Sequence, residues 1–233
     1  SLEVGQDIDA QLRRKGLLGK DIVLGTALMD MYAKCGALDK AREVFEHILP
    51  KRDVVSWNVL IDGYAQHGFG HEALKLFRQM QDVGVYPDVI TFVCILKTCS
   101  NLGSLEIGKA IDAEIRKRGL LRKNVVLGTA LVDMYSKCGA LEKAREVFIG
   151  LPEQSVVSWN ALTAGYVQHG HGEAALGCFR RMQDEGISPD GVSFASILKA
   201  CGSIGSLEIG YEVHAQIKDQ GLLENDIVLA TAL

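Results

Sequence analysis

The chain has 233 residues, of which 48% are hydrophobic and 23% charged, and its net charge is −4 at pH 7. This charge excludes a polycation that would bind nucleic acid through charge alone, but it leaves base-by-base recognition open. The sequence has no apolar run of the roughly 18 residues that a membrane-spanning helix needs.

The pattern of the first segment, residues 1–21, predicts that it forms the second helix of an incomplete repeat. It opens with Ser-Leu-Glu, in which the serine suits a helix N-cap, and it closes with basic residues that suit a helix C-terminus. The same pattern returns over 104–124 and 206–226. Because Ser1 already lies inside a repeat, we expect no targeting segment within these residues.

The next two segments are a shorter repeat over 22–53 and a 35-residue repeat over 54–88. The second of these predicts two amphipathic helices, because apolar residues recur at i, i+3, i+4 and i+7 twice. The two apolar stripes are Trp57, Leu60, Ile61 and Tyr64, and then Ala73, Leu76, Phe77 and Met80. Such a hairpin has too little apolar area to fold alone, so it must stack on its neighbours.

A 36-residue repeat over 89–124 completes the set, and the order then starts again. Residues 125–155 match 22–53, residues 156–190 match 54–88 at an offset of 102 (156 − 54), and residues 191–226 match 89–124. Residues 227–233 begin another short repeat. This repetition predicts an all-α solenoid of helix-turn-helix repeats that forms one domain over residues 1–233.

Two families of helical hairpins compete for this pattern. The tetratricopeptide pattern fits several positions, but Ile61 stands where that pattern has glycine, and the repeat lengths alternate. The phrases V-V-S-W-N, G-Y-A-Q-H-G, D-M-Y-A-K-C-G-A-L and A-R-E-V-F more closely resemble the pentatricopeptide repeat family and its plant PLS subclass. By this resemblance, 22–53 and 125–155 are S-type, 54–88 and 156–190 are P-type, 89–124 and 191–226 are L-type, 1–21 is a partial L-type and 227–233 a partial S-type repeat.

The resemblance implies a function as well as a fold. It implies a right-handed superhelix that binds single-stranded RNA, one base per repeat. It further implies a plastid or mitochondrial protein that selects cytidines for editing to uridine, with MORF-type organellar RNA editing factors as partners of the L-type repeats. The alternative is a tetratricopeptide-like scaffold for protein–protein interaction, which the acidic net charge slightly favours.

Base reading is assigned by the resemblance to the fifth and the last residue of each repeat. Short Asn, Thr and Asp side chains suit this role because each offers a fixed donor or acceptor. We expect the fifth residue to point out of the core, with the last residue beside it. The pairs are Thr26 with Asp53, Asn58 with Asp88, Val93 with Asn124, Thr129 with Ser155, Asn160 with Asp190, and Ala195 with Asp226. The last residues have a second interpretation, as N-caps of the next helix, and both can hold.

The pairing rule of the family implies a target when it is applied to each repeat. The Thr–Asp pair implies guanine, both Asn–Asp pairs imply uracil, and the Thr–Ser pair suggests a purine. No base is assigned where the fifth residue is Val93 or Ala195, because an apolar side chain cannot hydrogen-bond a base. The expected RNA is 5′-G-U-N-R-U-N-3′, with its 5′ end at the N-terminus of the chain.

The resemblance also implies two further sets of contacts. The second residue of each repeat would sandwich a base, although each could equally be a hydrophobic staple on its own helix. These residues are Val23, Val55, Ile90, Val126, Val157 and Val192. Lys34 and Lys137, in the S-type repeats, would contact phosphate, and the alternative is that both are solvated lysines without a role.

We expect no enzyme activity, cofactor or metal site. His171-Gly172-Glu173 matches the H-x-E part of zinc deaminases, but that motif also needs P-C-x-x-C, and no proline here is followed by cysteine. His67 and His71 are four residues apart with two glycines between them, which predicts a loop rather than a helical metal pair.

Overall fold

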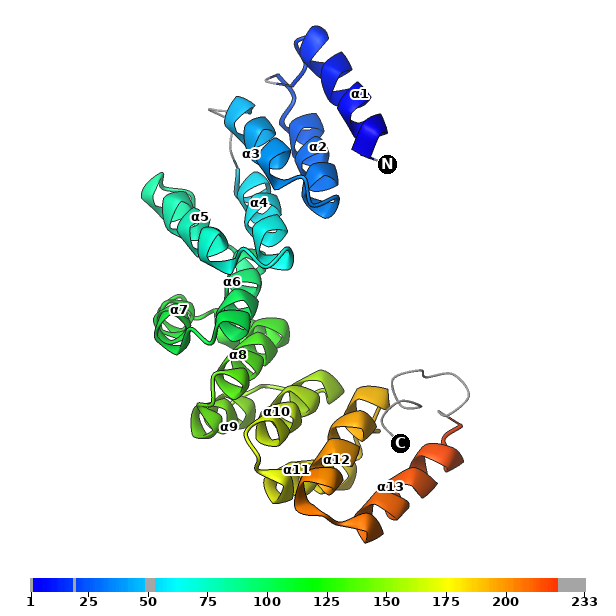
Figure 1. The fold of residues 1–233 in the computed structure, drawn as a ribbon. Helices are drawn as coiled ribbons and strands as arrows, with labels where there is room; N and C mark the ends of the chain where they lie inside the picture. The colour runs from blue at the N-terminus through cyan, green and yellow to red at the C-terminus, as the bar shows by residue number, and fades with distance from the viewer. Residues whose placement is uncertain (1, 19, 49–52, 222–233) are drawn as a thin grey trace. The chain divides into compact units, whose positions relative to one another are not determined.

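The computed structural model describes residues 2–18, 20–48 and 53–221, and the regular secondary structure in these ranges is entirely helical. Within them lie thirteen α-helices and the short 3-10 helix η1 (Leu120–Lys123), as Figure 1 shows. The all-α prediction is therefore confirmed. Of the helices described, none is both long enough and apolar enough to cross a membrane.

The chain divides into two compact bodies, an N-terminal body over Ser1–Leu102 and a C-terminal body over Gly103–Leu233. The N-terminal body contains α1 (Leu2–Arg14), α2 (Ile22–Lys34), α3 (Leu38–His47), α4 (Val54–Gln66), α5 (Gly70–Asp82) and α6 (Val89–Leu102). The C-terminal body contains α7 (Leu105–Lys117), α8 (Val125–Lys137), α9 (Leu141–Ile149), α10 (Val156–Gln168), α11 (Gly172–Asp184), α12 (Gly191–Ile204) and α13 (Leu207–Asp219). The division falls between the two helices of the predicted 89–124 repeat.

Four first helices, α2, α4, α8 and α10, each pack on the second helix of their own hairpin and on the first helix of the next repeat. In the N-terminal body α2 contacts α3 and α4, and α4 contacts α5 and α6 (Figure 1). In the C-terminal body α8 contacts α9 and α10, and α10 contacts α11 and α12. The first helices therefore form a continuous layer within each body, and the candidate site residues lie on this layer.

The apolar stripes of the sequence form the core between successive hairpins. Trp57 is buried, and its ring meets Phe45 edge to face with 4.7 Å between centroids. Trp159 is buried in the same way against Phe148 at 4.5 Å. Edge-to-face pairs of this kind stabilise a core beyond the area that they bury. The two tryptophans are thus core residues that join a shorter repeat to the 35-residue repeat after it.

Glycine in the middle of α4 and α10 lets neighbouring first helices approach closely. A Cβ added at Gly63 would lie 2.8 Å from Cβ of Ala33 on α2, and one added at Gly165 would lie 2.4 Å from Cβ of Ser136 on α8. Because real Cβ atoms do not come so close, a larger residue would push the two helices apart. The missing side chain therefore fixes the spacing of the layer.

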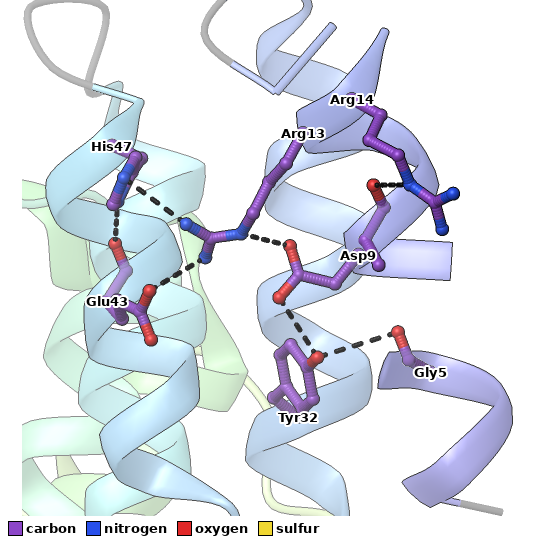
Figure 2. A network of polar contacts seen from close by, with 8 residues as sticks. Gly5, Asp9, Arg13, Arg14, Tyr32, Glu43 and His47 are labelled. Atoms are coloured by element: carbon purple, nitrogen blue, oxygen red, sulfur yellow. Dashed lines mark hydrogen bonds and ion pairs between the residues drawn. The ribbon is translucent and has the colours of Figure 1, made fainter. Parts of the chain in front are cut away.

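A tyrosine and an aspartate join α1 to α2, and an equivalent pair joins α7 to α8. In the N-terminal body, the Tyr32 hydroxyl donates to Asp9 Oδ2 (3.1 Å), and Arg13 Nε donates to Asp9 Oδ1 (2.6 Å). Arg13 also reaches Glu43 Oε1 at 3.1 Å and His47 Nε2 at 3.2 Å, so the network in Figure 2 ties α1 to both α2 and α3.

The same contacts recur in the C-terminal body, where the aspartate is more deeply buried. The Tyr135 hydroxyl donates to Asp112 Oδ2 at 2.8 Å, and Arg116 Nε donates to Asp112 Oδ1 at 2.7 Å. Asp112 is 4% exposed and Tyr135 is 2% exposed. A buried carboxylate is stable only when its oxygens are paired in this way. Burial, followed by the bond to Asp112, raises the pKa of Tyr135.

We predict that these tyrosines make the fold sensitive to alkali. Burial and then Asp9 raise the pKa of Tyr32 to about 12, against an ordinary value of about 10. Because the folded-state pKa is raised, the stabilisation is complete below the ordinary value and is lost as pH rises through the folded one. The double variant Tyr32→Phe, Tyr135→Phe should therefore lose less stability between pH 9 and 12 than the unchanged chain, as measured by urea denaturation.

The control for this prediction is Tyr211→Phe, since Tyr211 lies exposed on α13. This variant should follow the unchanged chain across the alkaline range. An alkaline loss of stability that is equally steep in the double variant would mean that the two buried hydroxyls do not cause it.

Candidate nucleic-acid interface

The first Asn–Asp pair of the sequence forms a hydrogen-bonded network in the N-terminal body. Asn58 Nδ2 on α4 donates to Asp88 Oδ1 at 3.1 Å, immediately before α6. The Thr91 hydroxyl lies 2.6 Å from Asn58 Oδ1 and 2.9 Å from Asp88 Oδ1. Asp88 also accepts from Thr91 N at 2.9 Å, and Asp88 N donates to the Thr91 hydroxyl at 3.1 Å. These reciprocal bonds form a capping box at the start of α6.

The second Asn–Asp pair repeats this network in the C-terminal body. Asn160 Nδ2 donates to Asp190 Oδ1 at 2.9 Å, and the Ser193 hydroxyl donates to Asn160 Oδ1 at 2.6 Å. Asp190 and Ser193 form the capping box of α12. The fifth residue of each 35-residue repeat thus lies beside the last residue of its own repeat, as predicted.

The expectation that the fifth residue points out of the core is wrong for both asparagines. Asn58 is only 8% exposed and Asn160 only 9%. The reason is that each amide bonds to a hydroxyl of the next first helix, which draws it between the helices. An amide has two donor hydrogens and two acceptor lone pairs, so each asparagine keeps one donor and one acceptor beyond these contacts.

The network sets the charge state of the two aspartates. Burial alone would raise the pKa of Asp88, but hydrogen bonds donated by Thr91 and Asn58 favour the ionised form and lower it below its usual range. The pKa of Asp190 is lowered for the same reasons, with Ser193 and Asn160 as the donors. Both carboxylates are therefore ionised at neutral pH and accept hydrogen bonds only. An acceptor-only neighbour orients the amide, because only the NH₂ side can face it.

The last residues of three other repeats, Asp53, Asn124 and Ser155, each cap the next helix. The Asp53 side chain accepts from Ser56 N in the capping box of α4, and the Ser155 side chain does so from Ser158 N at the start of α10. Asn124 accepts from Leu127 N at 2.9 Å before α8. The N-cap interpretation therefore holds, and for Asp88 and Asp190 it holds together with the pairing.

One cavity in the N-terminal body gathers residues with two of the predicted roles. It has a volume of about 390 Å³ and lies between α2 and α4. The residues around it include the predicted reading pair Thr26 and Asp53, and the predicted sandwiching residues Val23 and Val55.

 
A nucleobase entering this cavity would meet an apolar side chain from each of two successive repeats and a polar side chain from each of α2 and the cap of α4.

For the remaining predicted pairs, the structure shows no hydrogen bond between the two members within the described residues. Thr129 and Ser155 both lie in the C-terminal body and are partly exposed. Val93 and Asn124 belong to different bodies. Ala195 is partly buried on α12, and its predicted partner Asp226 lies outside the described residues.

The predicted sandwiching residues are all exposed, although each lies in the first turn of a first helix. Their exposed fractions run from 53% to 72%. They are Val23, Val55, Ile90, Val126, Val157 and Val192. A hydrophobic staple would be covered by its own helix, so this exposure leaves the side chains available for an apolar or aromatic ligand.

The two predicted phosphate lysines are held by carboxylates one helical turn earlier. Lys34 Nζ lies 2.6 Å from Asp30 Oδ2, and Lys137 Nζ lies 2.9 Å from Asp133 Oδ1. Both are exposed i, i+4 pairs, which contribute only a few tenths of a kcal/mol, roughly 0.3–0.5, to stability. A phosphate group could therefore replace the carboxylate at little cost.

Sequence reasoning missed the hydroxyls of Thr91 and Ser193 and the carboxylates of Asp30 and Asp133. A signal for each was present in the sequence. Thr91 and Ser193 stand three residues after an N-cap aspartate, which is the spacing of a capping box. Asp30 and Asp133 stand four residues before a lysine, which is the spacing of a helical ion pair.

Across residues 2–18, 20–48 and 53–221, no group of three or more His, Cys, Asp or Glu side chains could hold a metal ion. His67 and His169 instead serve the packing of the helices. His67 Nε2 lies 2.7 Å from the carbonyl oxygen of Ala33, and His169 Nε2 lies 3.0 Å from that of Ser136.

The geometry defines a class of protein: stacked helical hairpins with polar pairs and exposed apolar residues on the layer of first helices. The profile of the PPR repeat family matches residues 52–101 and 154–203, and that of the PPR repeat matches residues 26–49 and 129–156. Together these matches cover well over half of the sequence. The chain belongs to the pentatricopeptide repeat family.

Relatives from Arabidopsis thaliana cover nearly the whole chain. Pentatricopeptide repeat-containing protein At1g11290, chloroplastic, is 40% identical over 96% of the chain, and At3g09040, mitochondrial, is 40% identical over 100% of it. The chain spans only 27% and 22% of the length of these two relatives.

Solved structures show the same fold. The crystal structure of PPR10 from maize superposes with a TM-score of 0.69 at 23% identity, covering 90% of this chain and 33% of that one. PPR10 in complex with an 18-nt psaJ RNA element gives a TM-score of 0.61 at 20% identity, over 96% of this chain and 34% of that one.

We predict that removing the Thr91 hydroxyl lowers the free energy of unfolding more than removing another buried threonine hydroxyl does. Thr91→Val leaves the buried Asn58 Oδ1 without a donor, which costs about 1–3 kcal/mol. The control is Thr98→Val on the same helix, because the equally buried Thr98 hydroxyl bonds only to the carbonyl of Cys94. Urea denaturation should show the larger loss for Thr91→Val, and equal losses would contradict the network.

We also predict a loss of stability in acid that depends on Asp88 and Asp190. Because their folded-state pKa values lie below the ordinary value of about 3.9, the stabilisation is complete above that value and is lost as pH falls through the folded one. Asp88→Asn keeps a side chain that can cap a helix but removes the charge. The double variant Asp88→Asn, Asp190→Asn should have a flatter stability curve between pH 5 and 2.5 than the unchanged chain. An unaltered acid slope would argue against this assignment.

Proposed function

We propose that this chain binds single-stranded RNA and reads one base in each repeat whose fifth residue is polar. We further propose that it is the target-recognition part of an organellar C-to-U RNA editing factor of the PLS subclass. The proposed site of base reading is the layer of first helices in each body.

The observation that supports base reading most directly is the cavity of about 390 Å³ between α2 and α4. It combines two apolar side chains from successive repeats, Val23 and Val55, with the polar pair Thr26 and Asp53. Apolar walls with a few placed polar groups are typical of sites that bind a small planar group. A base held in this way would be stacked by the valines and selected by its edge.

The two Asn–Asp networks explain how a uracil could be selected. Asp88 and Thr91 fix the orientation of the Asn58 amide, and one amide hydrogen remains for a ligand. Uracil offers carbonyl oxygens that accept such a hydrogen bond. A fixed amide loses little freedom on binding, so its hydrogen bond can discriminate between bases.

Similar proteins give further support. PPR10 is named in complex with an 18-nt psaJ RNA element, and two relatives are named as chloroplastic and mitochondrial. We propose by this similarity a plastid or mitochondrial location for the chain, and MORF-type editing factors as partners of its L-type repeats.

A scaffold for protein–protein interaction is the second candidate, since the net charge is −4 and a row of valines is exposed. An acidic protein gains nothing from non-specific attraction to RNA. The oriented Asn–Asp pairs favour RNA, because a flat apolar contact surface would not need them.

The test exchanges one reading pair for another that already exists in the chain. The unchanged chain should bind 5′-G-U-A-A-U-A-3′ at least about thirtyfold more tightly than the same RNA with adenine at both uracils, given about 1–3 kcal/mol for each of the two base contacts. Asn58→Thr creates the Thr–Asp combination of Thr26 and Asp53, and should shift the preference at the second nucleotide from uracil to guanine.

The matched control is Asn160→Thr, which should shift the fifth nucleotide and leave the second unchanged. Fluorescence anisotropy with labelled RNA measures all of these affinities. Equal binding of the uracil and adenine RNAs would refute base reading, and no RNA binding at all would favour the scaffold.

A further inference from the structure

The two L-type repeats have no proposed role in base reading. Their fifth residues, Val93 and Ala195, are apolar and cannot hydrogen-bond a base. One turn later on the same helices stand Lys97 and Lys199, both exposed. Residues four apart lie on the same face of a helix, so each lysine follows directly after the position that would meet a base.

These lysines differ from the S-type lysines in their surroundings. Lys34 and Lys137 are each paired with an aspartate of their own helix. Neither Lys97 nor Lys199 has a carboxylate within ion-pair distance in the described part of the chain. An unpaired ammonium group can take up an anion without first losing a partner.

A cavity adjoins the first of these lysines. It has a volume of about 360 Å³ and lies between α4 and α6, with Lys97, Asn101 and Gln66 among the residues around it. Lys97 is the ninth residue of its repeat, and Asp30 is the ninth residue of the repeat 22–53. Asp30 lines the cavity between α2 and α4 together with Thr26. The ninth position of a first helix therefore lies next to the space proposed for the nucleotide.

We propose that Lys97 and Lys199 bind the phosphate groups of the RNA, so that the L-type repeats hold the backbone of a nucleotide whose base they do not read. This inference rests on the proposed function. A lysine is a compact point charge that suits a phosphate oxygen, and phosphate contacts supply affinity without sequence preference.

The two sites differ by one charge, which provides an internal comparison. Asp62 lies in the cavity beside Lys97, where Gln66 Nε2 donates to its Oδ2 and the Cys94 thiol to its Oδ1. The equivalent residue before Lys199 is Ala164, at an offset of 102 (164 − 62). An aspartate beside the site repels phosphate, so Lys199 should contribute more than Lys97.

The experiment measures RNA affinity against salt concentration for Lys199→Gln and for its control, Lys218→Gln. Lys218 is an exposed lysine on α13, the second helix of the same hairpin, so both variants change the net charge equally. Lys199→Gln should lower the slope of log affinity against log salt by about 0.7, which is about fivefold in affinity between 1 M and 0.1 M salt. The preference for uracil over adenine should not change.

A second variant, Asp62→Ala, gives the first site the composition of the second and should raise affinity at low salt for both RNAs. The inference is overturned if the unchanged chain binds RNA and Lys199→Gln has the same salt slope as Lys218→Gln. If the unchanged chain binds no RNA, the proposed function itself fails, and this inference fails with it.

Discussion

The structure depends on the packing of each first helix against the first helix of the next repeat. No hairpin buries enough apolar surface alone, so its stability comes from this junction. Two contacts define it: the close approach at Gly63 and Gly165, and the polar network around each buried asparagine. The edge-to-face tryptophans add a contact with the second helix of the preceding repeat. Each kind recurs in both bodies, so the junction is repeated together with the hairpin.

The asparagine network links stability to the proposed function in the same residues. Asp88 caps α6, orients Asn58 and remains ionised because its hydrogen bonds outweigh its burial. A residue that stabilises a helix cannot be changed freely to alter base preference. The small set of side chains at the last position of the repeats, Asp, Asn and Ser, fits that double constraint, because each can both cap a helix and present a fixed hydrogen-bonding group.

The sequence predicted the helical hairpins, the tryptophan core and the neighbouring position of Asn58 and Asp88, because all three follow from local periodicity and from the repeat. It did not predict that the asparagines are buried. Their burial depends on a hydroxyl from the following repeat, Thr91 or Ser193, and helical periodicity within one repeat carries no information about that contact. The division between Leu102 and Gly103 likewise has no counterpart in the repeat pattern.

The charges on the first helices are arranged by repeat type rather than spread evenly. The repeats 22–53 and 125–155 place an aspartate and a lysine one turn apart, and these neutralise each other. The 36-residue repeats 89–124 and 191–226 place a lysine where the aspartate would stand. A net charge of −4 therefore does not describe the surface proposed to meet RNA. An acidic chain can present isolated positive charges at the repeats for which no base reading is proposed, and this arrangement would favour specific contacts over general attraction to nucleic acid.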